Sequence, residues 1–421
     1  MKMRSETEPF GMKRNFAWNT SGSLFYFGCQ WLLTVLVVVL SDGFSNAGSF
    51  SYAMAIGNIF APIALFSVRV YQISDVANLY SASNYVAFRL CTMLLASVVT
   101  LAYLLFSTSS GGLLVASVLF LLFKADESFV DVLYAIEQKN QRMDYIGKSQ
   151  IIRGFASLGS FSVMLWLFNN LSWAIIAMFV SCILVTLFYD LSRAKLFGEL
   201  VPTINKGILW SLAKACLPIM ISGFCLTATV ALTRQYFGLA FGEEELGIYA
   251  SIATPAVILQ TAALYLYSPA LVTMAEKHNS GNYQGFIKSF TNIILLLAGV
   301  VLAIGIATTV AGNWLLPIVF GPGVSPHLHI LPFVMAGVGL AGMLGFVVAA
   351  LIIMRQYKWM LIAGAVCFVC CLALTPVLIS NYHMNGINLA LISGNALGLI
   401  VGVFGLLKVS RVANRRFQLE D

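Results

Sequence analysis

Long apolar stretches separated by short polar connections run along almost the whole sequence. Most approach the ~20 residues that a helix needs to cross a bilayer, and they are too long for barrel strands of about 9–11 residues. The pattern predicts an all-α polytopic membrane protein with about twelve transmembrane helices. Their approximate bounds are 22–41, 47–71, 84–107, 112–138, 148–168, 171–191, 208–234, 245–273, 285–311, 326–354, 358–380 and 385–407.

The basic residues test this count, because Lys and Arg concentrate in the cytoplasmic loops of membrane proteins. With twelve spans and a cytoplasmic N-terminus, all but two of the 24 basic residues fall in inner connections or near inner ends. The exceptions are Lys124 and Arg234. The distribution therefore predicts that both termini are cytoplasmic and that the number of spans is even.

A polar segment from Arg193 to Lys206 falls near the middle of the chain. It predicts two pseudo-symmetric lobes of six helices, residues 1–200 and 201–421. Because an even number of helices preserves orientation, the two halves should be parallel repeats. A short N-Y-x-x-F match, in Asn84–Phe88 and Asn282–Phe286, opens the third and ninth spans and agrees with this division.

Composition supports a membrane protein without a soluble domain. Hydrophobic residues make up 59% of the chain and charged residues only 10%, and the mean hydropathy is +0.88. Soluble domains carry about 25% charged residues. We therefore expect this chain to lie in a membrane and to bind no nucleic acid.

The sequence offers little to an enzyme. It contains no G-x-x-x-x-G-K-[ST] loop for a nucleotide, and the outer connections are too short to hold a catalytic site. The eight cysteines all lie within apolar stretches, so Cys367-x-x-Cys370-Cys371 is interpreted as part of the packed core. The pair His327-x-His329 is likewise not interpreted as a metal site, because no third ligand type is close in sequence. We expect no catalytic residues, no metal and no cofactor.

The fourth predicted span contains several ionisable groups. Its uninterrupted apolar run, Leu113 to Phe123, covers about half a bilayer, so the helix can cross only if the charges that follow enter the membrane. Each such charge costs about 2.5–3.5 kcal/mol on insertion scales, which makes a partner or a water-filled path necessary. Two interpretations stay open, a transport pathway and a purely structural ion-pair network. At helical spacing the polar stripe comprises Lys124, Glu127, Asp131, Tyr134 and Gln138.

Other spans carry weaker polar stripes that are typical either of a cavity or of ordinary hydrogen bonds between helices. Asn19 and Gln30 accompany the first span, and Gln260 lies in the eighth. Arg69, Arg89 and Arg153 sit near inner ends, where snorkelling to lipid headgroups is the default expectation. Arg234 breaks the positive-inside pattern, which favours an anionic substrate as its partner.

Several short motifs resemble the Wzx-type polysaccharide flippases of the multidrug/oligosaccharidyl-lipid/polysaccharide (MOP) exporter superfamily. The resemblance covers the N-terminal half well, and the C-terminal half matches only in span pattern. The motifs are Asn19-Thr-Ser-Gly-Ser23, Gln30-Trp31, Arg69-x-x-Gln72-x-Ser74-Asp75, Lys124-x-x-Glu127-Ser128-x-x-Asp131-Val132, Gln138-x-x-x-Arg142-Met143-Asp144 and Ser149-x-x-x-Arg153-Gly154.

The resemblance implies two six-helix lobes, a central cavity and alternating access in a bacterial cytoplasmic membrane. The expected substrate is an oligosaccharide on undecaprenyl diphosphate, moved from the inner to the outer leaflet for surface polysaccharide synthesis, with glycan polymerase and other assembly proteins as further partners. Glu127 and Asp131 would couple an ion, although the fourth span usually lies away from the cavity in this family. The expected substrate-binding residues are Arg69, Lys124, Arg234, Asn19, Gln30 and Gln260.

Two alternatives stay open. An ion-coupled multidrug exporter of the same superfamily should have an acidic, aromatic cavity for cationic drugs, and the three intramembrane cations speak against it. A non-transporting scaffold of a glycan-assembly complex would tolerate neutral replacement of all three. A flippase would lose transport on the same replacement.

Overall fold

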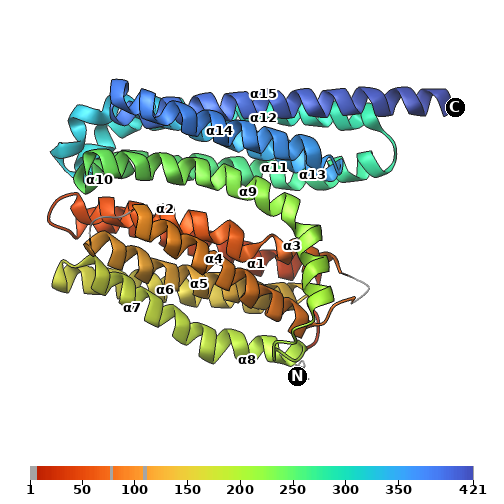
Figure 1. Cartoon of the computed structure of the whole chain (residues 1–421), viewed down its shortest axis with the longest axis horizontal. Coiled ribbons are helices and arrows are strands. Elements are labelled where there is room, and N and C mark those ends of the chain that lie inside the picture. Colours follow the sequence, from red (N-terminus) through yellow and green to blue (C-terminus); the bar gives the residue numbers. More distant parts are fainter. Residues whose placement is uncertain (1–6, 76–78, 108–110, 421) are drawn as a thin grey trace. The chain divides into compact units, whose positions relative to one another are not determined.

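The computed structural model describes residues 7–75, 79–107 and 111–420, and these residues are almost entirely helical (Figure 1). The elements are α1 Met12–Val39, α2 Ser45–Leu65, α3 Val68–Ser74, α4 Ala82–Ser107, α5 Gly111–Lys139, α6 Met143–Phe168, α7 Leu171–Val185, the π-helix η1 Thr186–Asp190, α8 Leu191–Ala194, the 3₁₀ helix η2 Lys195–Phe197, α9 Lys206–Phe241, α10 Glu243–Ala253, α11 Ala256–Asn279, α12 Tyr283–Phe320, the 3₁₀ helix η3 Pro322–Ile330, α13 Leu331–Ile353, α14 Tyr357–Tyr382 and α15 Met384–Glu420.

Within the described residues, eleven helical segments are long and apolar enough to span a membrane. The helix α5, with 29 residues, is also long enough to span a membrane and would be the twelfth such segment. It is absent from that group because every stretch of spanning length within it includes at least three charged residues. The predicted all-helical membrane fold is confirmed. Some bounds differ, since α1 begins at Met12, and the expected span 245–273 is divided into α10 and α11 at Pro255.

The chain divides into two compact units, Met1–Met220 and Ile221–Asp421. The division falls inside α9, later than the polar segment in which the lobes were expected to separate. The first part of α9 stays with the N-terminal unit because Leu212 and Cys216 pack in a buried cluster with Phe66, Phe88 and Leu133.

In the N-terminal unit, α1 lies against α6, while α2 packs against α5 and α4. The close approach of α1 and α6 depends on glycine at two facing positions. A Cβ at Gly22 would lie 2.5 Å from Cα of Gly147, and a Cβ at Gly147 would lie 2.3 Å from the carbonyl oxygen of Trp18. Small residues allow membrane helices to approach in this way, where burial against lipid gives no hydrophobic gain.

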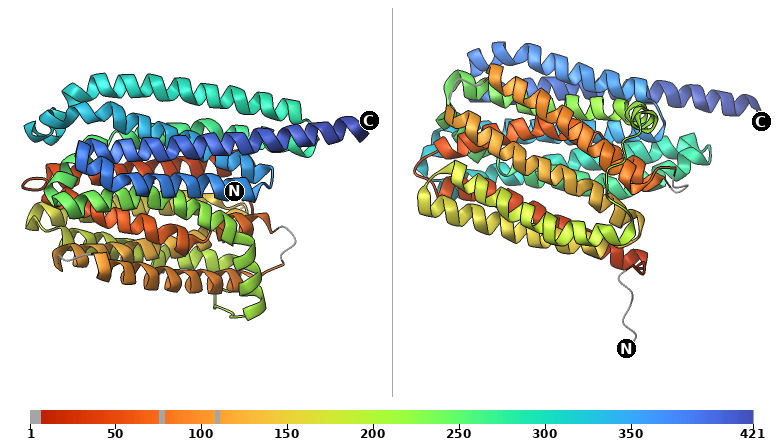
Figure 2. Two further views of the ribbon diagram at one scale, coloured as in Figure 1. Left: turned by 45° about the horizontal axis from the view of Figure 1, so that its top comes forward. Right: turned by 60° about the horizontal axis from the view of Figure 1, so that its bottom comes forward.

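In the C-terminal unit, the most extensive packing joins α14 and α15 (Figure 2). Gly394 makes this contact possible, because a Cβ there would lie 2.7 Å from the carbonyl oxygen of Cys367. The interior of the unit is aromatic and aliphatic, with Phe290 and Phe346 stacked at a ring distance of 5.3 Å. The end of α15 extends past α14 in every view (Figures 1 and 2).

Candidate functional site

The charged helix α5 lies inside the N-terminal unit, in contact with α2, α3, α4, α6 and α7. Its charged side chains are therefore buried or half-buried, whereas Val115 and Leu122 on the same helix stay exposed. The polar stripe expected from the sequence is present, but its members reach different neighbours. Lys124, Glu127 and Asp131 each meet a partner from another helix or from their own, as intramembrane ionisable groups generally do.

The first cluster joins Lys124 and Glu127 of α5 with Tyr26 of α1. The Lys124 ammonium donates to Oε2 of Glu127 at 2.6 Å, and the Tyr26 hydroxyl donates to Oε1 of the same carboxylate. The Lys124 stem passes Gly57 of α2, where a Cβ would come within 3.0 Å of Cγ of Lys124. About a quarter of the Lys124 side chain stays accessible.

The second cluster surrounds Asp131, which is shared by two arginines. Arg69 of α3 donates to Oδ1 at 2.9 Å, and Arg89 of α4 donates to Oδ2 at 2.7 Å. Arg69 also donates to Oε1 of Gln138 at 2.9 Å. The two arginines differ in access, because the Arg69 side chain is 30% exposed and the Arg89 side chain is fully buried.

A break between α2 and α3 positions Arg69. Phe66 and Ser67 adopt left-handed backbone conformations with φ of 47° and 54°, which end α2. Such a conformation costs roughly 1–2 kcal/mol for a non-glycine residue. The break frees the carbonyl oxygen of Ala64, which accepts from Arg89 at 2.8 Å and from Thr92 at 2.7 Å. Arg89 thus both closes the end of α2 and neutralises Asp131.

The third cluster lies on the opposite side of α5 and is fully buried. Arg153 of α6 donates to Oδ2 of Asp126 and, at 3.5 Å, to Oδ2 of Asp190. Thr186 donates to Oδ1 of Asp126 at 2.6 Å and accepts from Arg153 at 2.8 Å. The sequence pattern did not predict this cluster. The expectation that Arg89 and Arg153 snorkel was wrong, since their residues are 0% and 2% exposed and both are paired with aspartates.

The remaining expected site residues lie apart from these clusters. On α1, Asn19 is half-buried, and Gln30 donates to the Ser157 hydroxyl of α6 at 3.3 Å, a bond between helices. Arg234 and Gln260 belong to the C-terminal unit. There the Arg234 guanidinium lies 5.5 Å from the Tyr249 ring, and Gln260 is exposed on α11.

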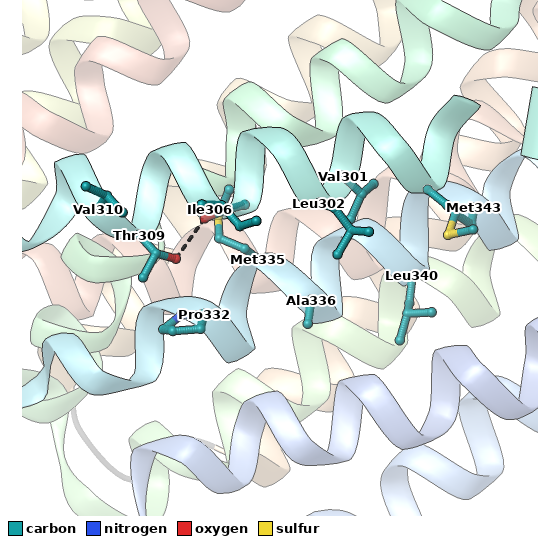
Figure 3. A pocket seen from close by; sticks show the side chains of 12 residues that line it. Val301, Leu302, Ile306, Thr309, Val310, Pro332, Met335, Ala336, Leu340 and Met343 are labelled. Atoms are coloured by element: carbon teal, nitrogen blue, oxygen red, sulfur yellow. Dashed lines mark hydrogen bonds between the residues drawn. The ribbon is translucent and has the colours of Figure 1, made fainter. Parts of the chain in front are cut away.

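Each unit also contains a pocket. One end of the N-terminal unit holds a cavity of about 660 Å³ whose lining includes the polar residues Gln72, Tyr80 and Lys139. The C-terminal unit has a cavity of about 530 Å³ between α12 and α13 (Figure 3). Its lining is apolar except for Thr309, whose hydroxyl donates to the carbonyl oxygen of Gly305 at 2.8 Å. This second pocket suits a hydrocarbon chain and offers nothing to a sugar or a phosphate.

Outside the membrane spans, Asp75 is an enclosed carboxylate with several donors. It accepts from the N–H groups of Leu79 and Tyr80 and from the hydroxyl of Tyr85, and Lys139 lies 3.7 Å away. Burial raises the pKa of this carboxyl, but the hydrogen bonds and the lysine outweigh burial and hold the pKa below its usual value.

Comparison with solved structures identifies the architecture. A multidrug resistance MATE family transporter of the MOP superfamily, solved in an inward-facing conformation, matches with a TM-score of 0.76 and 12% identity, covering 91% of this chain and 95% of the other. A MOP superfamily transporter from Pyrococcus furiosus matches with a TM-score of 0.61 and 12% identity, covering 98% of each chain. The chain has the fold of the MOP-superfamily transporters.

Sequence comparison adds a polysaccharide-related protein to these similarities. The capsular polysaccharide biosynthesis protein CapF of Staphylococcus aureus is 22% identical over 399 residues, which cover 92% of this chain and 98% of that protein. No protein-family model matches the chain. The resemblance to the MOP superfamily predicted from the sequence motifs is therefore confirmed for the fold.

Proposed function

We propose that this protein is a flippase that moves a polyprenyl-diphosphate-linked oligosaccharide from the inner to the outer leaflet of a bacterial cytoplasmic membrane. The observation that carries the proposal is the pair of partly exposed cations Lys124 and Arg69, each held by a carboxylate of α5 in a MOP-type fold. The full-length similarity to a capsular polysaccharide biosynthesis protein supports it.

An exchange of ion partners would let the two cations bind and release the substrate. A diphosphate is a stronger competitor for Lys124 and Arg69 than a neutral sugar, because charge-assisted hydrogen bonds to phosphate are about twice as strong as neutral ones. When the diphosphate binds, Glu127 and Asp131 lose a cationic partner each, although Asp131 keeps Arg89. When it leaves, the internal ion pairs re-form. The cations are therefore neutralised in both states, and the substrate is not held irreversibly.

The wider proposal follows the sequence expectations. Both termini face the cytoplasm, two lobes alternate access, and Asn19, Gln30, Arg234 and Gln260 contact the glycan or the diphosphate. Glu127 and Asp131 take part through the cations that they release. Glycan polymerase and other assembly proteins act on the product, and no chemical step is catalysed by this chain.

The test uses purified protein in liposomes that contain a fluorescent polyprenyl-diphosphate oligosaccharide, with outer-leaflet arrival measured by a membrane-impermeant quencher. Lys124→Ala and Arg69→Ala should each lower the rate at least tenfold. Lys148→Ala is the matched control, because Lys148 also pairs with an aspartate, Asp144, which keeps Arg142 as its second partner. The control should transport at the wild-type rate.

The same variants separate the alternatives. Unchanged transport by Lys124→Ala and Arg69→Ala would contradict the proposal and favour a scaffold. A wild-type protein that expels cationic drugs, and moves no lipid-linked oligosaccharide, would favour a multidrug exporter. In cells, deletion of the gene should cause lipid-linked oligosaccharide to accumulate on the inner leaflet while drug sensitivity stays unchanged.

A further inference from the structure

The cavity at one end of the N-terminal unit, about 660 Å³ in volume, has the size and the lining of a ligand site. Small-ligand sites measure about 300–1,000 Å³, and most combine apolar and aromatic walls with a few polar groups. Here the walls come from α3, the start of α4, the end of α5 with the turn after it, and η2. Tyr80, Tyr85 and Phe197 supply aromatic surface, and Gln72 and Lys139 supply polar groups.

Gln72 of α3 contributes a buried oxygen without a donor. The residue is 1% exposed, its Nε2 donates to the carbonyl oxygen of Val132 at 3.4 Å, and its Oε1 has no partner among the described residues. Exchange of the two amide atoms would not help, because the oxygen would then face the Val132 carbonyl. Buried polar atoms are nearly always bonded, since an unpaired one destabilises the fold. Gln72 lines the cavity, so a donor on a ligand would satisfy its oxygen.

The cavity is electrically balanced, which argues against an anionic ligand. Lys139 is the one charged residue in its lining, and the Lys139 ammonium lies 3.7 Å from Oδ2 of Asp75. That separation is longer than a hydrogen bond, so the ammonium can also donate to a ligand. A phosphate would have to approach both the Asp75 carboxylate and the unpaired Gln72 oxygen, and both would repel it.

A ligand for this cavity must therefore donate and accept hydrogen bonds, carry no net charge and present an apolar face. Hydroxyl groups both donate and accept, so one can donate to Gln72 while another accepts from Lys139. The C–H bonds on one face of a pyranose ring are apolar and suit the negative face of an aromatic ring. Tyr80 and Tyr85, whose rings lie 6.0 Å apart, and Phe197 offer such surface. A sugar ring meets all three conditions.

The cavity also lies close to a cation that is proposed to bind the diphosphate. Gln72 follows Arg69 by three positions on α3, and residues at this spacing are neighbours on a helix surface, about 5–6 Å apart. On α5, Lys139 directly follows Gln138, whose Oε1 accepts from Arg69 at 2.9 Å. A sugar joined to a diphosphate at Arg69 would therefore be within reach of the cavity.

We propose that this cavity binds a sugar ring and that, in transport, it takes the sugar attached directly to the carrier diphosphate. The second part rests on the proposed function. Arg69 would then recognise the diphosphate that every carrier-linked glycan shares, whereas Gln72 and Lys139 would select the sugar. Binding forms and breaks no covalent bond.

Saturation-transfer-difference NMR tests the site with free sugars. Full-length protein in nanodiscs is mixed with the methyl glycosides of glucose, galactose and N-acetylglucosamine, and transfer to the ring protons is measured. The wild type should show transfer to at least one of them, and Gln72→Leu should reduce it severalfold. Leu is of similar size and removes the unpaired oxygen, so Gln72→Leu should melt at or above the wild-type temperature.

Gln150→Leu is the matched control, because Oε1 of Gln150 is already engaged by the Ser23 hydroxyl of α1 at 3.0 Å. It should bind sugar as the wild type does. Phe197→Ala keeps both polar groups and removes aromatic surface, so it should weaken transfer as well. Equal transfer in the wild type and Gln72→Leu, or no transfer from the wild type to any of the glycosides, would overturn the proposal. A wild-type Tm that rises with inorganic diphosphate, in a way that Lys139→Ala abolishes, and not with sugar would assign the cavity to an anion and overturn it too.

The role in transport is tested in the liposome assay. Gln72→Leu should raise severalfold the concentration of lipid-linked oligosaccharide that gives half-maximal transport, and the maximal rate should stay close to that of the wild type. An unchanged half-saturation concentration would refute this role. If the wild type moves no lipid-linked oligosaccharide while sugar binding depends on Gln72, the proposed function fails and the sugar site stands.

Discussion

Replacement of Asp131 by Asn tests whether the ion-pair network stabilises the N-terminal unit. The change keeps the shape of the side chain and removes its charge, which leaves the fully buried Arg89 without a counter-ion. Removal of one partner from a buried pair costs about 3–5 kcal/mol. We use the lower end, about 3 kcal/mol, because Asp131 is 19% exposed and the partly exposed Arg69 can turn to water.

Thermal unfolding of the purified protein in detergent measures the effect. A loss of about 3 kcal/mol corresponds to a fall in Tm of roughly 6–12 °C for a unit of this size. The double variant Asp131→Asn with Arg89→Met should recover most of the loss, since a well-packed apolar side chain often replaces a buried ion pair at little cost. Thr92 still donates to the Ala64 carbonyl in that variant. An unchanged Tm for Asp131→Asn, or strictly additive effects in the double variant, would refute the reasoning.

Two further predictions concern packing and pH. Gly147→Ala should lower Tm by the equivalent of about 1–3 kcal/mol or more, because the added Cβ would collide with the Trp18 carbonyl. Gly159→Ala on the same helix is the control. A Cβ there meets nothing within 4 Å, so this variant should be neutral or stabilising. Asp75, whose pKa is lowered in the folded state, contributes stability above its unfolded pKa of about 3.9, and that contribution is lost as the pH falls through the folded value. Asp75→Asn should therefore lower Tm near neutral pH, and the difference from wild type should shrink on acidification. A constant difference between neutral and acidic pH would contradict this.

The positions of the helices could be predicted from the sequence because the bilayer imposes a simple length rule. The case of α5 is the clearest. Its apolar run is too short for a span, but the basic residues on either side of it required a crossing, and the structure contains a continuous helix of 29 residues there. For α5 the charge distribution decided what hydropathy alone left open.

The partners of the α5 charges could not be predicted in the same way. A helical stripe gives the side chains one common face, but the stripe does not say how far each side chain reaches. Glu127 meets Tyr26 of α1, Asp131 meets arginines of α3 and α4, and Tyr134 lies 2.7 Å from the Ser149 hydroxyl of α6. These contacts depend on how the helices rotate about their axes, and Tyr26 is 101 positions away from its partner in the chain.

The arginines show where a default rule failed. Snorkelling was expected for Arg89 and Arg153 from their distance to a helix end alone. Intramembrane carboxylates usually pair with a cation, and Lys124 could serve only one of those in α5. Counting the α5 carboxylates against that single lysine would have indicated that cations from other helices are needed, without identifying which ones.

Exposure to solvent separates the ion pairs of α5 into two groups. The pairs of Lys124 with Glu127 and of Arg69 with Asp131 are partly exposed, whereas the pairs of Arg153 with Asp126 and Asp190 are closed to solvent. Under the proposed function, substrate exchange would occur at the partly exposed turns of α5 that carry Lys124 and Asp131. Variants of Lys124 should accordingly alter substrate affinity in the liposome assay.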